Sequence, residues 1–279
     1  MLIRNLLCTV LCVLPLASTS AKVFDKSEII SLFQSVFSSP VLVEQQITKL
    51  GLQGEKAELL RQVYKDYSKD EELLNYFATQ MEQVGFGDQK FGDDVDAYYR
   101  YTFELLTNLQ ADLYRKGVLK LGGEDIVILY ERQLRVAELL SPKMCKNFFE
   151  GNVDRYLASN FSEANKRIIR QSSIQELRSF YTHFNRAMKV ALNEDYQANP
   201  LTASEKRFAS DAFQVAIQRG LEAMPKAQQE RMINVALDFD GASDKDICEF
   251  YKFSLKQMLK LESPIRDWTL KMNLEMLGH

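Results

Sequence analysis

The chain has very little histidine, and this scarcity excludes several kinds of active site. His183 and His279 are the only two histidines among the 279 residues. Two histidines cannot form a three-histidine zinc site, and a Ser-His-Asp or Cys-His mechanism would have to use His183, because His279 ends the chain. The Gly-x-Ser-x-Gly and Ser-x-x-Lys motifs of nucleophilic enzymes are also absent. His183 borders an apolar helical stripe, which is typical of a packed side chain.

Cysteine is scarce as well, and no Cys-x-x-Cys motif occurs. Of the four cysteines, Cys8 and Cys12 belong to an N-terminal segment that we expect to be removed. Cys145 and Cys248 remain, and neither has an adjacent histidine that would activate a thiol. Two such cysteines in an oxidising compartment most simply pair with each other. The sequence therefore predicts a structural disulfide between Cys145 and Cys248.

Positive charge is not in excess, since 35 Lys and Arg stand against 38 Asp and Glu. Nucleic-acid binding requires clustered Lys and Arg, so we predict no nucleic-acid partner. Charges of both signs are interleaved along most segments, which is typical of a solvated surface. We predict no cofactor.

The N-terminus carries the features of a secretory signal peptide. Arg4 precedes an apolar run over residues 6–16, and small residues follow at 19–21. The run is about half the length needed to span ~30 Å of hydrocarbon, so no membrane-spanning segment is expected after its removal. The sequence predicts a signal peptide at 1–21, a mature chain that begins near Lys22, and a periplasmic or secreted protein.

Glycine and proline are sparse, with 12 and 6 copies, and they fall between periodic segments. Apolar residues recur every three or four positions, and no segment alternates with period two over the length of a strand. The sequence predicts an all-α fold of about eleven or twelve helices, arranged as a multi-helix array or as two stacked bundles. The disulfide would join a helix at 142–160 to a helix at 244–261.

Several local patterns indicate where the helices begin and end. Residues 25–28 and 68–71 each fit a capping box, in which two side chains satisfy free backbone N–H groups. Gly51 and Gly117 stand where helices should stop.

A glycine-rich segment offers a domain boundary. Residues 85–94 contain three glycines and separate a short-helix region at 22–92 from a main helical domain at 93–279. A long loop within one domain is an equally permitted interpretation.

A weak internal duplication is a further hypothesis. Residues 141–145 and 243–248 both read as a cap, a lysine and a cysteine, and each follows a pair of predicted helices. Capped helices resemble one another, however, and the apolar residues between the two segments do not align without gaps. We slightly favour chance resemblance.

Aromatic residues crowd the start of one predicted helix. Because neighbouring aromatics cover more than one helix face, at least one of them should point away from the core. Rigid aromatic side chains dominate interface hot spots, so this cluster is a candidate partner-binding site. The alternative is packing under the N-terminal helices. The cluster consists of Tyr98, Tyr99, Tyr101 and Phe103.

One acidic segment has a spacing that suits calcium, which takes six to eight oxygen ligands. Acids at its first, third, ninth and twelfth positions are Asp238, Asp240, Asp246 and Glu249. The segment departs from an EF-hand at its fifth and sixth positions. A simpler interpretation is that Gly241 ends one helix and Ser243 caps the next, and we favour it.

Three functions agree with these features. The first is an exported binding or adaptor protein that acts without catalysis on another protein of the envelope or extracellular space. The second is a carboxylate-dependent hydrolase of a cell-envelope polymer, because carboxylates are the plentiful catalytic groups. The third is a carrier of an apolar ligand between helices rich in aromatics and methionine. We favour the first, since no polar catalytic cluster is evident.

Overall fold

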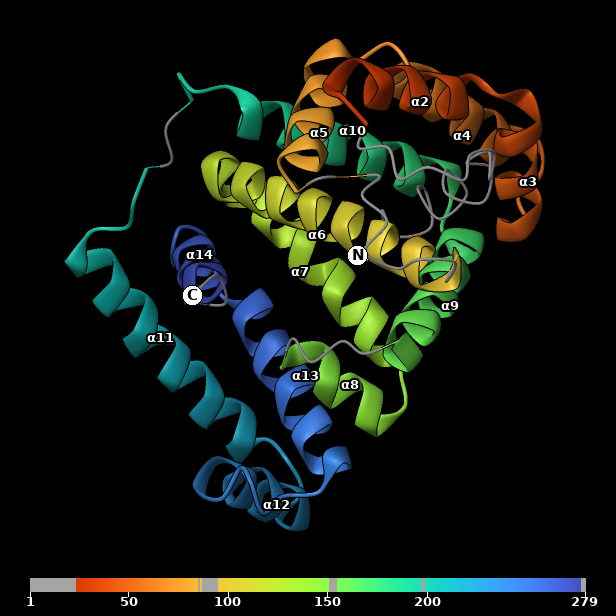
Figure 1. The fold of residues 1–279 in the computed structure, drawn as a ribbon. Helices are drawn as coiled ribbons and strands as arrows, with labels where there is room; N and C mark the ends of the chain where they lie inside the picture. Colours follow the sequence, from red (N-terminus) through yellow and green to blue (C-terminus); the bar gives the residue numbers. More distant parts are fainter. Residues whose placement is uncertain (1–23, 85, 87–94, 151–154, 197–198, 277–279) are drawn as a thin grey trace. The chain divides into compact units, whose positions relative to one another are not determined.

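The computed structural model describes residues 24–84, 86, 95–150, 155–196 and 199–276; the side chains of residues 95–104, 106–107 and 155–162 are outside this description (Figure 1). The described ranges contain thirteen helices and no strand, so the predicted all-α fold is confirmed. The helices are α2 (Lys26–Ser38), α3 (Pro40–Leu50), α4 (Gly54–Tyr67), α5 (Glu71–Gln83), α6 (Val95–Leu121), α7 (Gly123–Glu138), α8 (Pro142–Phe149), α9 (Arg155–Gln171), α10 (Ile174–Leu192), α11 (Ala203–Glu222), α12 (Lys226–Leu237), α13 (Asp244–Lys260) and α14 (Ile265–Met276).

The helix predicted at 142–160 is in fact two helices. α8 ends at Phe149 with Glu150 as its C-cap, and α9 begins at Arg155. Gly151 is the next residue in the sequence after Glu150, and glycine is a poor helix former. The helix predicted at 244–261 is α13 and is confirmed to within one residue.

Of the helix ends predicted at Asp25, Gly51 and Ser68, the first two are confirmed and the third is wrong. Asp25 Oδ1 accepts from the backbone N–H of Glu28 at 2.9 Å, and the Glu28 side chain accepts in return, which completes the capping box. Gly51 adopts a left-handed φ of 66° at the end of α3. At 68–71, by contrast, Asp70 caps α5 and Ser68 instead ends α4. Asp70 directly precedes the first residue of α5, and its side chain accepts a hydrogen bond from the free backbone N–H of Leu73.

Contacts between Cα atoms divide the chain into two compact units. Unit 1 comprises 1–117 and 165–196, and unit 2 comprises 118–164 and 197–279. The chain passes between the units within α6 and within α9. The predicted boundary at residues 92 and 93 falls outside the described residues and stays a prediction. In the ranges that the structure describes, no helix is both long and apolar enough to cross a bilayer.

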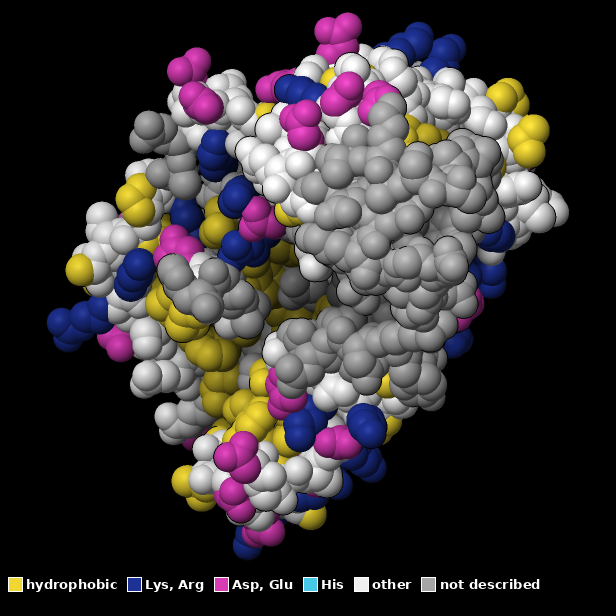
Figure 2. All heavy atoms as spheres, in the orientation of Figure 1, with side chains coloured by type: hydrophobic (Ala, Val, Ile, Leu, Met, Phe, Trp, Pro, Cys, Tyr) yellow, Lys and Arg dark blue, Asp and Glu magenta, His cyan; other side chains and the backbone are white. Residues whose placement is uncertain are grey.

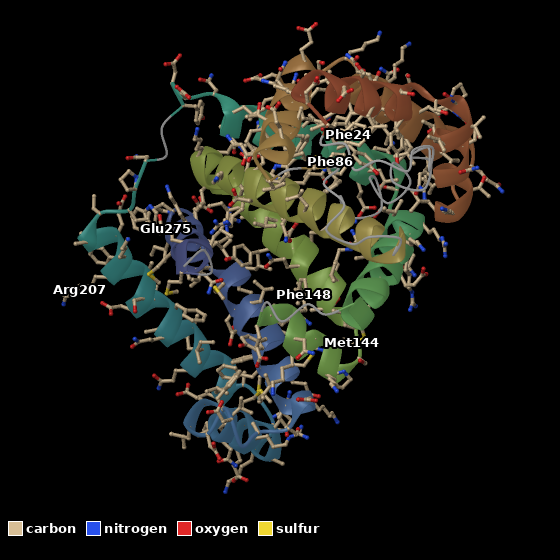
Figure 3. All side chains as sticks on the ribbon, viewed as in Figure 1. Phe24, Phe86, Met144, Phe148, Arg207 and Glu275 are labelled. Atoms are coloured by element: carbon tan, nitrogen blue, oxygen red, sulfur yellow. A yellow bond between two sulfur atoms is a disulfide. The ribbon has the colours of Figure 1, made fainter. Side chains whose placement is uncertain are left out.

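Unit 1 is built on aromatic packing among α2, α4, α5 and α10. The Phe37 ring lies 6.0 Å from the rings of Tyr64 and Tyr67. Before α2, Phe24 packs against Phe86 with ring centroids 5.8 Å apart, and its backbone N–H donates to the Phe86 carbonyl at 3.0 Å (Figure 3). These contacts give unit 1 its own hydrophobic core.

His183 is a packed side chain, as the sequence indicates. It is 5% exposed on α10, and its Nε2 is hydrogen-bonded to the hydroxyl of Tyr114 at 2.7 Å. The two rings meet edge to face, with centroids 5.5 Å apart.

Gly117 lies inside α6, so the prediction that it ends a helix is wrong. A Cβ atom at this position would lie 1.7 Å from the carbonyl oxygen of Ala187 in α10 and 2.4 Å from its carbonyl carbon. The backbones of α6 and α10 therefore touch at Gly117, and no side chain fits between them. Glycine serves here as a helix contact and not as a helix stop.

We expect Gly117→Ala to destabilise the protein by about 1–3 kcal/mol, because overpacking forces the two backbones apart. Helix propensity alone would favour alanine by about 1 kcal/mol, so the sign of the effect is diagnostic. Urea unfolding measures the difference, with Asn108→Ala, at an exposed position of the same helix, as the control. A stabilised Gly117→Ala variant would contradict the close contact.

Unit 2 is organised around α13, which contacts α7, α8, α11, α12 and α14. A disulfide joins Cys145 of α8 to Cys248, the fifth residue of α13, with the two Cα atoms 5.5 Å apart. Both cysteines are buried and pack against Ala137 of α7. The predicted disulfide is therefore confirmed, and its surroundings are those of a structural bridge.

The double variant Cys145→Ala/Cys248→Ala should lose about 4–5 kcal/mol of unfolding free energy, because the bridge closes a loop of 103 positions in the unfolded chain. Urea unfolding with and without reductant measures this loss. Reductant should destabilise the unmodified protein and leave the double variant unchanged. Two free thiols in the oxidised, unfolded protein would contradict the bridge.

Candidate functional site

An apolar groove in unit 2 is the candidate site. Its volume is about 700 Å³, and residues of α7, α8, α11, α12, α13 and α14 line it. Figure 2 shows hydrophobic side chains gathered in a hollow beside α11. Ligand sites have volumes of ~300–1,000 Å³, so the groove has the size of a small-molecule site.

One wall of the groove is an apolar stripe on α11. Phe213, Ile217 and Leu221 recur every four residues, which places them on one face of the helix. All three stay half-buried, and Ala209 is the one residue of α11 that is buried. α11 packs mainly against α14 and leaves this stripe facing the groove.

The opposite wall is formed by α13 and is rich in aromatic rings. Tyr251 stacks on Phe149 of α8 with ring centroids 4.8 Å apart, and the Phe239 ring meets it edge-on at 5.7 Å. Burial, and to a smaller extent the nearby Glu150, raise the pKa of Tyr251. The Tyr251 phenol therefore stays uncharged at neutral pH, and the wall carries no phenolate charge.

A second tyrosine lines the groove from α7. The Tyr130 hydroxyl donates to Asn273 Oδ1 of α14 at 2.7 Å, and burial raises the pKa of Tyr130. This hydrogen bond satisfies a buried polar group without introducing charge.

The polar groups of the groove are nearly all uncharged. Four of them are the glutamines Gln133, Gln214, Gln218 and Gln229. Glu222 is the one charged residue in the described part of the lining, and Gln218 Nε2 donates to its Oε1 at 2.9 Å. Hydrolases of the kind considered above use two facing carboxylates, so the groove gives that hypothesis no support.

The structure places the predicted aromatic cluster within α6, and its side chains lie outside the described residues. A partner-binding role for Tyr98, Tyr99, Tyr101 and Phe103 therefore stays a prediction.

Side chains of the acidic segment at 238–249 form local hydrogen bonds and an ion pair. Asp238 Oδ1 accepts from the backbone N–H of Gly241 at 3.1 Å. Ser243 caps α13, because its Oγ accepts from the backbone N–H of Asp246 at 3.2 Å. Glu249 forms an ion pair with Arg231 at 3.9 Å. Across the described side chains, no group of three or more His, Cys, Asp or Glu is placed to hold a metal ion.

The capping interpretation of this segment is confirmed at Ser243 and needs one correction. α12 ends at Leu237 with Asp238 as its C-cap, so Gly241 does not end the helix. It lies in the turn that follows, where its backbone N–H satisfies Asp238.

Sequence reasoning missed the groove. The stripe at 213, 217 and 221 has the spacing of any core-facing helix, so it gives no sign of exposure by itself. The structure shows that α11 and α12 also carry exposed apolar residues outside the stripe, including Phe208 and Leu237, which are 60% and 80% exposed, and helical periodicity does not reveal this exposure.

No protein-family model matches the chain, and neither curated proteins nor solved structures show a significant similarity to it.

Proposed function

We propose that the chain is an exported, non-enzymatic binding protein that holds its ligand in the groove of unit 2. The observation that carries this proposal is the half-buried apolar stripe of α11 opposite the aromatic wall of α13. Apolar surface that remains open to water is costly in solubility and commonly marks a binding site. A ligand that covers Phe213, Ile217 and Leu221 would remove that surface from water.

An apolar small molecule suits the groove better than the protein partner that the sequence favours. The volume lies within the range of small-molecule sites, and the few polar groups are mostly amides that can orient a ligand. The chain would then act as a carrier. A protein partner remains a hypothesis for the cluster at 98–103.

Export is supported by the sequence and by the bridge together. The features at 1–21 are those of a signal peptide, and a structural disulfide persists best in an oxidising compartment. A periplasmic or secreted location follows from this proposal.

A neutral apolar dye tests the groove directly. Nile red should bind the unmodified protein with increased fluorescence, and Ile217→Asp should weaken binding at least about tenfold, because a charge in the apolar wall is costly to desolvate. Val215→Asp is the matched control, since Val215 lies on the same helix, is 45% exposed and does not line the groove. Equal affinities of Ile217→Asp and the unmodified protein would rule out this site.

Export is tested by expressing the full chain in a bacterial host with an active secretion pathway. The exported protein should begin near Lys22, as shown by N-terminal sequencing and intact mass. Leu11→Arg should retain the precursor in the cell, because a charge interrupts the apolar run that the secretion machinery binds. Full-length protein found only inside the cell would contradict the signal peptide.

A further inference from the structure

The groove carries charge of one sign only. Among the residues that the structure describes, its lining contains Glu222 and no Lys, Arg or His. The Gln218 amide holds the carboxylate through a hydrogen bond of 2.9 Å to Oε1. A ligand with a carboxylate or phosphate head would meet this acid and find no cation in the lining. A positively charged head is complementary to it.

Aromatic rings lie at the same end of the groove as Glu222. A Cβ on Gly220 would be 2.7 Å from the Phe253 ring and 2.8 Å from the Gln257 side chain, which places the end of α11 against the middle of α13. The first half of α13 lies directly before this contact in the sequence. Phe250 and Tyr251 in that half of α13 line the groove. Figure 1 shows that the end of α11 and the start of α13 both reach α12. Aromatic faces attract cations, so they add to the preference that Glu222 sets.

The length of the groove sets the length of an apolar chain. The lining residues of α11 run from Phe213 to Glu222, and those of α13 from Phe250 to Met258. At ~1.5 Å per residue, these stretches are about 12–14 Å long. An extended chain advances about 1.2 Å per bond, since a residue of three bonds spans ~3.6 Å. An extended chain of about ten to twelve carbons therefore spans the groove.

We propose that the groove binds a single-chain amphiphile with a positively charged head. The alkyl chain lies along the stripe of Phe213, Ile217 and Leu221, and the head lies beside Glu222 and Tyr251. This inference rests on the proposed function and names the ligand class of the same site.

Isothermal titration of the mature protein with three twelve-carbon amphiphiles tests the head group. The probes are dodecyltrimethylammonium, dodecanoate and a neutral dodecyl glycoside, each below its micelle concentration. The cation should bind about three- to tenfold more tightly than the neutral probe, because an exposed ion pair and a cation–π contact contribute modestly. Dodecanoate should bind most weakly. Binding of dodecanoate as tight as that of the cation would overturn the proposal.

The same titration with shorter and longer trimethylammonium probes tests the chain length. Affinity should rise by up to about fourfold per methylene up to about twelve carbons, and then level off as the chain leaves the groove. A rise that continues unchanged to sixteen carbons would contradict the site.

Glu222→Gln should lower affinity for the cation by up to about fivefold and leave the neutral probe unaffected. Glu230→Gln is the matched control, since Glu230 is an exposed acid of α12 outside the groove. An unchanged preference in Glu222→Gln, with Nile red still bound, would overturn the head-group assignment and leave the proposed function standing. If the unmodified protein bound neither Nile red nor any of the amphiphiles, both the head-group assignment and the proposed function would be overturned.

Sedimentation equilibrium tests whether the groove is instead covered by a second copy of the chain. We expect a monomer over the working concentration range. A dimer that Ile217→Asp dissociates would assign the groove to the second copy and overturn the amphiphile proposal.

Discussion

The disulfide between Cys145 and Cys248 ties the beginning of α13 to α8, and the arrangement of unit 2 depends on where α13 is held. α13 contacts five other helices, so its circumference is shared among more neighbours than a helix in a simple bundle has. Ile247 and Cys248 are buried in the core and do not line the groove, whereas Tyr251 and Leu255 contribute to the groove wall. A cross-link near the start of α13 restricts sliding of this helix along its own axis. The residues that it contributes to the core and to the groove wall therefore keep their positions relative to the neighbouring helices.

Side-chain size along α11 explains why a groove remains beside α13. Helices approach closely where residues are small, and Gly220 allows such an approach to Phe253. Ala209 provides the buried small contact near the other end of the helix. Between these two points, Phe213 and Ile217 are large and stay half-buried. The helix is thus anchored by small residues near both ends, and its bulky stripe borders open space.

The predictability of the chain follows from how local each interaction is. Helical periodicity, the Asp25 capping box and the left-handed Gly51 depend on neighbouring residues, and sequence reasoning found them. The disulfide followed by elimination, because two cysteines allow one pairing. Gly117 was misjudged because its role depends on Ala187, seventy positions away. The groove was missed for the same reason, since spacing does not show whether a stripe is covered.

The exposed stripe links the stability of unit 2 to its function. Leaving Ile217 and Leu221 half-buried forgoes part of the burial that normally stabilises a helical domain, and a small domain has little stability to spare. The disulfide offsets part of that loss by limiting the unfolded chain, so the groove can remain open without its ligand. A bound apolar molecule would then stabilise unit 2 further by mass action, because it binds the folded state alone. In the proposed binding protein, the bridge would hold the groove in shape, and a bound ligand would cover the apolar stripe of α11.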